Sequence, residues 1–303
     1  MTPQRRDRPN GRWTREAMLR ESERWVHVPP SGILAEDAGR LLVHLPAPRG
    51  ASRVWRSWPA RGEAEALILR TIEEARAAGG ARLVWHTGDG VSPPFMDDLL
   101  SQHGFEKTED LEVLAFELGM DPQPRLPALR VPANVRTRLV EDGADLRRAN
   151  SVDASVFHGL AWDERDTRAY LEGLSKLEGR GRRRPHAPED APEDAPVVLR
   201  YLASVQENAG KEPEIVATAG AEVTGETVRL WGAGTRAQHR GRGAYRSLVA
   251  ERCRHAHAFG ATLALTKANT VSSAPILRRA GFRLIARERR HTLKLAAPTH
   301  PRA

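Results

Sequence analysis

A glycine-rich turn between a strand pattern and a helix pattern is the feature that most limits the possible folds of this chain. The turn spans residues 238–243 and contains Gly241 and Gly243, and the patterns cover Thr227–Thr235 before it and Ala244–Phe259 after it. Glycines one residue apart let backbone N–H groups converge on an anion, and a helix N-terminus adds free N–H groups and a positive dipole end. Three arginines raise the local positive potential: Arg236, Arg240 and Arg242. The stretch therefore predicts a pyrophosphate-binding loop.

Two common phosphate-binding motifs do not fit this turn. The P-loop requires Gly-x-x-x-x-Gly-Lys-Ser/Thr, and that spacing is missing. The dinucleotide fingerprint requires a third glycine, which is absent after Gly243. The pattern that fits is Gln/Arg-x-x-Gly-x-Gly/Ala, which Gln238, Gly241 and Gly243 satisfy. Here the sequence resembles the GNAT acyltransferase superfamily, whose members hold the pyrophosphate of acyl-coenzyme A in such a loop.

The resemblance continues beyond the loop, and it covers the chain from about Asn134 to Leu295. A strand pattern over Ala261–Thr266, a helix pattern over Ser273–Ala280 and the pair Gly281-Phe282 follow in the order that the superfamily shows. The resemblance implies an α/β fold with a mixed sheet.

The first half of the chain shows the same order of elements without the glycine loop. Gly80–Trp85 resembles Gly260–Leu265, and each follows a long amphipathic helix pattern. Gly104-Phe105 likewise resembles Gly281-Phe282, and each follows a short helix pattern. The two members of each matching pair are separated by nearly the same number of residues, which indicates a duplicated unit. The sequence therefore predicts two GNAT-like domains in tandem, of which the first is degenerate.

Proline and charge patterns predict the domain boundaries. We expect a flexible basic tail over residues 1–22, a degenerate GNAT-like domain over 23–120 and a proline-rich linker over 121–133. The acyltransferase domain is expected over 134–297. Within it, residues 178–196 contain an imperfect Ala-Pro-Glu-Asp repeat, which predicts a disordered surface insertion.

The resemblance implies a binding site for acetyl-coenzyme A. Residues 231–233 would lie at a splayed strand end and pair with the pantetheine arm and the thioester carbonyl. The backbone N–H groups of residues 239–244 would bind the pyrophosphate, and Asn269 would contact the cofactor. The complete predicted set is Trp231, Gly232, Ala233, Gln238, His239, Arg240, Gly241, Arg242, Gly243, Ala244 and Asn269.

The implied reaction is direct acyl transfer to an amine, which needs a general base and benefits from a general acid. The superfamily often supplies the acid as a tyrosine four residues before the Gly-Phe pair, and that position is Leu277 here. Tyr245 is a candidate acid, although it falls on the apolar face of its helix pattern. Glu222 and Glu226 are candidate bases, although each also fits a solvated turn carboxylate.

Other polar residues have competing interpretations. Asp163 and Glu164 fall between two predicted helices, where they could attract a cationic amine, but Asp163 equally fits a helix N-cap. The lone cysteine, Cys253, lies on an apolar helix face and is interpreted as a packed thiol. His255 and His257 point to different faces of their helix, so no metal site is expected.

Charge and hydropathy limit the partners. The net charge of +8, from 47 Lys and Arg against 39 Asp and Glu, favours an anionic partner or an arginine-rich surface. No motif combines aromatic and basic residues, so nucleic acid is not a favoured partner. The chain has no apolar run of 18 residues and no apolar secretory core near residue 1, so we expect no membrane partner and a cytoplasmic location.

Three functions are compatible with these observations. The favoured one is an acetyl-coenzyme A-dependent N-acetyltransferase that acts on a small-molecule amine, with a peptide N-terminus or a lysine as further possible acceptors. The alternatives are a non-catalytic acyl-coenzyme A sensor and a nucleic-acid binder. The sequence does not indicate the oligomeric state.

Overall fold

The structure is a computed structural model that describes residues 12–29, 31–37, 39–45, 50–119, 124–157, 162–178, 196–207, 210 and 212–295. The predicted insertion, apart from its end residues, lies outside the described residues. The chain divides into two compact units by its internal contacts. Unit 1 holds the described residues of 1–21, 114–267 and 276–283, and unit 2 holds those of 22–113, 268–275 and 284–303.

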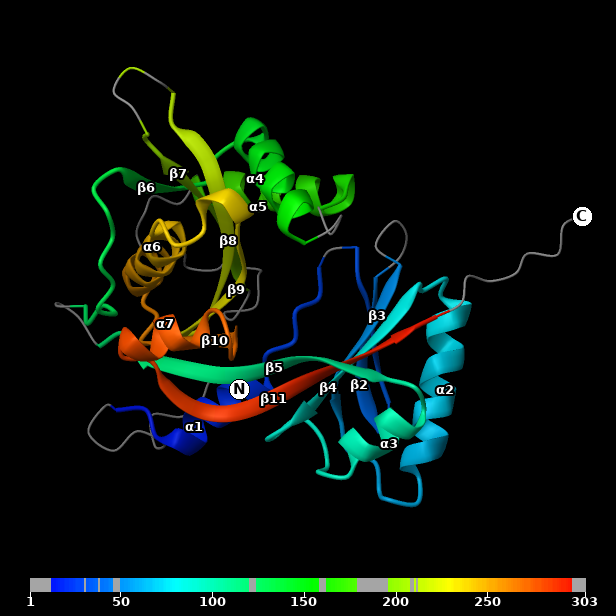
Figure 1. The fold of residues 1–303 in the computed structure, drawn as a ribbon. Coiled ribbons are helices and arrows are strands. Elements are labelled where there is room, and N and C mark those ends of the chain that lie inside the picture. Colours follow the sequence, from blue (N-terminus) through cyan, green and yellow to red (C-terminus); the bar gives the residue numbers. More distant parts are fainter. Residues whose placement is uncertain are drawn as a thin grey trace, which may run out of the picture. The chain divides into compact units, whose positions relative to one another are not determined.

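Unit 1 is a mixed sheet with helices on both faces (Figure 1). Leu202 packs among residues of α4 and α5, whereas the neighbouring Tyr201 contacts His255 of α6. Because successive side chains of a strand point to opposite faces, α4 and α5 cover one face and α6 the other. The strand order is the C-terminal end of β5 (Glu106–Glu117), β10 (Leu263–Asn269), β9 (Thr227–Thr235), β8 (Glu214–Thr224), β7 (Val197–Val205) and β6 (Val135–Leu139). The helices are α1 (Arg15–Glu23), α4 (Gly143–Val156), α5 (Glu164–Glu178), α6 (Ala244–Ala258) and α7 (Ala274–Arg279).

Unit 2 holds the remaining strands, also in mixed orientation, and its core lies under two helices. Leu83 and Trp85 of its central strand pack against Ile68 and Met96 of those helices. The strand order is β1 (Ile33–Glu36), β2 (Arg40–Leu45), β3 (Ala51–Ser57), β4 (Arg82–Gly88), β11 (Arg283–Lys294) and the N-terminal part of β5. The helices are α2 (Ala64–Ala77) and α3 (Met96–Gln102).

The two units share a central construction. In unit 2, β3 and β4 are parallel and pair from Ala51↔Arg82 to Val54↔Trp85. In unit 1, β9 and β10 are parallel and pair from Thr227↔Leu263 to Leu230↔Thr266. Each parallel pair thus has four matched positions, and in each unit a long helix connects the two strands. The duplicated unit predicted from the sequence is therefore present in the fold.

The structure refines or differs from the predicted elements in four places. The sequence predicts that the tail runs into a short helix near Thr14–Trp25, and the structure has α1 there, with Trp13 and Met18 buried within unit 1. The sequence does not predict the four-residue strand β1. It predicts a strand over Leu111–Leu118, and β5 begins five residues earlier, at Glu106. The sequence predicts a strand pair or one long bent strand over Gly281–Leu295, and the structure has one strand, β11, whose residues from Leu284 onward belong to unit 2. No helix among the described residues is long and apolar enough to span a membrane.

Candidate functional site

A wedge opens between the C-terminal ends of β9 and β10. Their last matched pair is Leu230↔Thr266, where the Thr266 hydroxyl also donates a 3.0 Å hydrogen bond to the Leu230 carbonyl oxygen. From Trp231 onward, β9 has no matched partner on β10 among the described residues. Unpaired strand edges present backbone N–H and C=O groups that need partners. The wedge therefore offers these groups to an extended ligand.

A β-bulge lies at the start of the wedge. The register between β8 and β9 shifts between Thr218↔Gly234 and Gly220↔Trp231, so that Gly232 and Ala233 together oppose one residue of β8. Gly232 has a φ of +57°, the left-handed conformation that a glycine adopts in one common type of bulge. A bulge bends its strand and redirects the backbone groups. Residues 231–233 thus stand where β9 and β10 part, and their predicted contact with the cofactor stays a prediction.

A buried arginine of α6 donates hydrogen bonds to the backbone at the bulge. The Arg252 side chain is 2% exposed, and its Nη1 donates to the carbonyl oxygens of Gly220 (2.9 Å) and Trp231 (3.4 Å). Burial lowers the pKa of this guanidinium. Gly220 has no Cβ, and a Cβ there would lie 2.5 Å from the Trp231 ring. The hydrogen bond from Arg252 fixes the Trp231 backbone, and the absence of a Cβ at Gly220 leaves room for the Trp231 ring.

An aromatic and cationic stack forms one wall beside the wedge. The rings of Trp231 and Trp162 lie 6.3 Å apart at an interplanar angle of 17°. The Arg200 guanidinium lies over both rings, at 4.7 Å from the Trp162 centroid and 5.6 Å from the Trp231 centroid. Arg200 also donates to Asp153 at 2.6 Å and to Thr218 at 3.0 Å. This wall lies on the face of the sheet that carries α4 and α5.

The predicted glycine turn has the geometry that an anion site needs. Gly241 and Gly243 have φ values of +79° and +93°, which side chains rarely tolerate. Gly243 is the N-cap of α6 and offers no side chain to the first-turn N–H groups, which have no partners inside the helix. By contrast, Asp142 caps α4 and Asp163 caps α5, each accepting from a backbone N–H at 2.7 and 2.8 Å. The N-terminus of α6 is thus open to an external acceptor, and the N-cap interpretation of Asp163 is confirmed.

The polar side chains of the turn have different surroundings. Arg242 pairs with Glu207 at 2.5 Å, and Arg240 is exposed, with its Nε donating to the Thr235 carbonyl oxygen at 3.4 Å. His239 is buried and lies 3.3 Å from a carboxylate oxygen of Glu214, so its side chain holds the turn against β8. Gln238 is exposed. Arg236 donates to the Ser151 hydroxyl at 3.3 Å, so the positive charge left at the loop is that of Arg240 and Arg236.

The structure does not bring the two candidate bases to the wedge. The Glu222 carboxylate pairs with Arg229 at 2.8 Å, and both side chains are buried. Glu226 lies in the turn before β9, where its carbonyl oxygen accepts from the N–H groups of Thr262 and Leu263. At about 3.3 Å per strand residue, Glu226 stands about 16 Å along β9 from Trp231. Glu226 therefore lies toward the opposite end of the strand. Glu222 opposes Arg229, two residues before Trp231, and its carboxylate is engaged in the buried ion pair.

The remaining predicted residues are placed as follows. Tyr245 is the second residue of α6 and is partly exposed beside the glycine turn. Leu277, at the position of the usual acid, is 0% exposed. The Asn269 side-chain oxygen accepts from the N–H groups of Val271 and Ser272, both at 3.1 Å, so it caps the turn after β10. No group of three or more potential metal ligands occurs in the part of the chain that the structure describes.

Unit 2 has the corresponding wedge, but its own chain closes it. By strand register, Trp55 corresponds to Trp231, and a bulge between β2 and β3 falls at Trp55. Beyond the last parallel pair, the Ser57 N–H donates to the Val91 carbonyl oxygen at 2.8 Å, and the Trp85 indole donates to the Ser57 hydroxyl at 3.2 Å. The following turn carries Pro59 where unit 1 has its glycines. The degenerate character expected of the first half has this physical basis.

Sequence reasoning missed the side chains that support the wedge. Arg252 lies beside the apolar positions of α6, and a single arginine at such a place is a weak signal for a buried anchor. Trp162 and Arg200 are separated by 38 positions, and no local pattern connects them. Their proximity depends on the packing of α5 against the sheet.

Comparisons with known proteins identify solved structures that have a similar fold. No family model matches the chain, and no curated protein matches it. A GCN5-related N-acetyltransferase from Kribbella flavida matches at a TM-score of 0.55 and 19% identity over 89% of this chain and 91% of the other. A GCN5-related N-acetyltransferase from Sphaerobacter thermophilus matches at a TM-score of 0.56 and 19% identity, over 94% of this chain and 87% of the other. A tandem GNAT protein from the clavulanic acid biosynthesis pathway matches at a TM-score of 0.53 and 13% identity, over 93% of this chain and 89% of the other. The chain therefore has the GNAT fold, with two GNAT-like domains in tandem.

Proposed function

We propose that this chain is an N-acetyltransferase that transfers the acetyl group of acetyl-coenzyme A to a primary amine, with small molecules as the favoured acceptors and peptide amines as the next. The observation that carries the proposal is the continuity of the wedge with the anion site. The bulge at Gly232 and the turn at Gly241 lie close together in the chain, on one strand and its following loop. A ligand with a pyrophosphate at one end and an extended amide-bearing arm at the other matches that arrangement.

Each end of the site has a defined task in this proposal. The first turn of α6 and the N–H groups of Gly241 and Gly243 bind the pyrophosphate, and Arg240 adds a positive charge. The backbone groups of residues 231–233 pair with the pantetheine arm and orient the thioester carbonyl. The stack of Trp162 and Trp231 forms an apolar wall that limits water around the reacting atoms. The coenzyme itself supplies the activated acyl group.

The acyl group passes directly to the amine, without an enzyme-bound intermediate. The only thiol of the chain, Cys253, is fully buried, and burial raises its pKa to about 12. A thiol of that kind is a poor nucleophile at neutral pH. The amine nitrogen attacks the thioester carbon and forms the amide bond, and the carbon–sulfur bond breaks. The nitrogen gives up one proton to a base, and the departing thiolate takes up one proton to leave as the thiol.

The proton donor is the least conventional part of the site. Burial raises the pKa of Tyr170 and of Tyr201, and their hydroxyl groups are already bonded, to the Val140 carbonyl oxygen and to His255 respectively. Leu277 has no proton to give. Tyr245, beside the glycine turn, therefore stays the candidate acid. Glu222 and Glu226 stay sequence-based candidates for the base, and their positions favour deprotonation of the amine by water.

Calorimetric titration with acetyl-coenzyme A tests the binding half of the proposal. A Cβ at Gly241 would meet open space, and the positive φ there is one that Asn and Asp tolerate better than other side chains. Gly241→Asn and Gly241→Asp are thus matched in shape and differ by one charge. We expect Gly241→Asp to weaken binding at least about tenfold more than Gly241→Asn, because a carboxylate would face the pyrophosphate. Absence of binding by the folded wild-type chain would refute the proposal.

The alternative is a non-catalytic protein that binds acyl-coenzyme A, and buried Leu277 at the usual acid position favours it. An amine panel with a free-thiol assay separates the two functions. Release of coenzyme A that depends on an added amine supports the transferase, and Tyr245→Phe should then lower kcat more than it changes KM. Tight binding without release across small amines, peptides and lysine would establish the sensor.

A further inference from the structure

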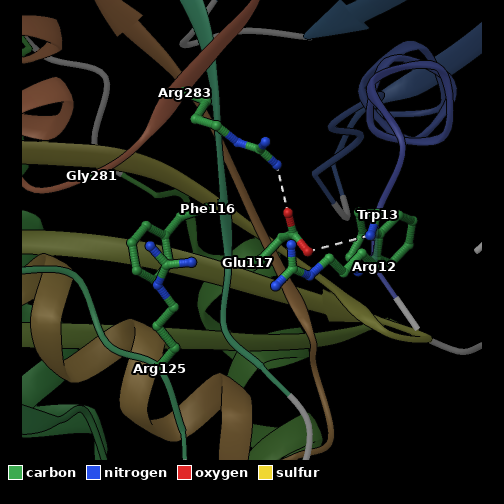
Figure 2. Close-up of a pocket in the computed structure, with 7 residues that line it drawn as sticks. All are labelled: Arg12, Trp13, Phe116, Glu117, Arg125, Gly281 and Arg283. Carbon is green, nitrogen blue, oxygen red and sulfur yellow. Dashed lines mark hydrogen bonds and ion pairs between the residues drawn. The ribbon is translucent and has the colours of Figure 1, made fainter. Parts of the chain in front are cut away.

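A second cavity lies in unit 1, apart from the wedge. Its volume is about 320 Å³. It lies where β5 ends and β11 begins, and in the sheet β10 separates β5 from β9. Seven residues line it: Arg12, Trp13, Phe116, Glu117, Arg125, Gly281 and Arg283 (Figure 2). No step of the proposed acyl transfer uses any of them.

The lining carries an excess of positive charge. Three guanidinium groups face one carboxylate, that of Glu117, which leaves a formal charge of +2. Arg283 pairs with Glu117 at 2.5 Å, as Figure 2 shows. Arg12 and Arg125 form no ion pair with a carboxylate in the described part of the chain. Two guanidinium groups are therefore available to an anion that enters the cavity.

The side chains that form the cavity wall are held by contacts that leave Arg12 and Arg125 without a carboxylate partner among the described residues. The Trp13 indole donates to the Thr262 hydroxyl at 3.0 Å, and the Trp13 backbone N–H donates to Glu117 at 3.3 Å. Trp13 is 7% exposed, so the residue next to Arg12 is anchored in unit 1. Arg125 lies over the Phe116 ring, with its guanidinium carbon 5.5 Å from the centroid (Figure 2). Arg125 thus lies over a buried aromatic ring, that of Phe116.

We propose that this cavity binds a small organic molecule with two negative charges on oxygen, either a phosphate monoester or a dicarboxylate. Guanidinium groups bind such oxyanions through paired N–H donors, and Arg12 and Arg125, which form no ion pair among the described residues, match two negative charges. The volume falls within the range of small-molecule sites and exceeds what a bare inorganic ion fills. The organic part of the ligand then occupies the space beside Trp13 and Phe116. This site is independent of the proposed acetyltransferase activity.

The test is calorimetric titration of the full chain with three probes that share one ring. Phenyl phosphate is the phosphate monoester, isophthalate is the dicarboxylate, and phenol is the uncharged control. We expect one or both dianions to bind and phenol not to bind, and the stronger dianion identifies the ligand class. Arg12→Gln and Arg125→Gln should each weaken that binding about tenfold, because each removes a charge-assisted hydrogen bond.

Two further variants separate a built site from general attraction to a basic protein. Arg130 is exposed, belongs to unit 1 and does not line the cavity, so Arg130→Gln should leave the affinity unchanged. Glu117→Gln removes the only negative charge and keeps an acceptor for Trp13, so it should strengthen binding severalfold. The proposal is overturned if neither dianion binds at millimolar concentration, or if Arg130→Gln weakens binding as much as Arg125→Gln. Gly241→Asp should not alter this binding, whatever its effect on acetyl-coenzyme A.

Discussion

Arg252 donates a 2.9 Å hydrogen bond to the carbonyl oxygen of Gly220, from a guanidinium group inside unit 1. Its Nε donates to the Leu248 carbonyl oxygen at 3.0 Å, and within the described chain it has no carboxylate partner. The side chain belongs to α6, whose N-terminus is the candidate anion site, and its acceptor lies on β8 behind the bulge. One arginine thus joins the pyrophosphate end of the proposed site to its thioester end.

Replacing this arginine should destabilise the fold. Arg252→Met keeps most of the apolar stem but leaves the Gly220 carbonyl oxygen without its charged donor. Relief of the buried charge offsets part of that loss, so we expect the free energy of unfolding to fall by about 1–3 kcal/mol. Urea denaturation measures it. The control is Arg254→Met, an exposed arginine paired with Glu251, which should change stability by less than about 1 kcal/mol. Equal stabilities for the two variants would contradict the anchoring role.

The two glycines of the turn should differ in their tolerance of alanine. Both have left-handed φ values, so each substitution costs about 1–2 kcal/mol of backbone strain. A Cβ at Gly241 meets open space, whereas a Cβ at Gly243 overlaps the Pro132 ring. We therefore expect Gly243→Ala to be less stable than Gly241→Ala by about 1–3 kcal/mol. It should also bind acetyl-coenzyme A more weakly, because the first turn of α6 must shift. Thermal unfolding with and without ligand measures both effects.

The chain should bind one acetyl-coenzyme A, although it contains the GNAT-like fold twice. In unit 2 the Val91 carbonyl oxygen already accepts from the Ser57 N–H, at the position where unit 1 leaves its bulge open. The turn after β3 lacks a pair of glycines one residue apart. Calorimetry should therefore give a stoichiometry of one per chain. A value of two would mean that the segment around Val91 leaves the wedge when the ligand binds.

Much of the site could be predicted because its demands are local. A left-handed turn and an open helix N-terminus require glycines at fixed spacing, and Gly241 and Gly243 show that requirement in the sequence alone. Apolar runs over Val197–Val205, Glu214–Val223 and Thr227–Thr235 predict three strands. Strands β7, β8 and β9 match them to within one residue, since these runs are mostly buried. The small landmarks Gly104-Phe105 and Gly281-Phe282 likewise revealed the tandem fold.

The parts that could not be predicted depend on contacts between distant residues. Strand β1 is short and mostly exposed, with Ile33 at 61%, so it lacks the alternation that indicates a strand. The closure of the unit 2 wedge rests on a backbone bond between Ser57 and Val91, which any residue type could make. The pairing of Glu222 with Arg229 requires the register of β8 and β9, which the sequence does not state.

Cys253 should be inert in the native protein. It is fully buried, as the sequence interpretation of a packed thiol predicted, and burial raises its pKa to about 12. We expect no reaction with Ellman's reagent at pH 8 under native conditions and one thiol per chain after denaturation in guanidinium chloride. Rapid labelling of the native chain would show that the α6 face opens to solvent.

Glu222 should matter more for folding than for proton transfer. Its carboxylate and the Arg229 guanidinium are both buried at 2.8 Å, so Glu222→Gln leaves a buried cation without its counter-ion. Such a change costs about 3–5 kcal/mol of stability. The double variant Glu222→Gln/Arg229→Met removes the cation as well and should recover part of that loss. If Glu222 were the general base, the double variant would recover stability but lose amine-dependent turnover and its pH dependence. We expect turnover in the refolded double variant to follow its folded fraction, and a steady-state assay across pH 6–9 decides between the two roles.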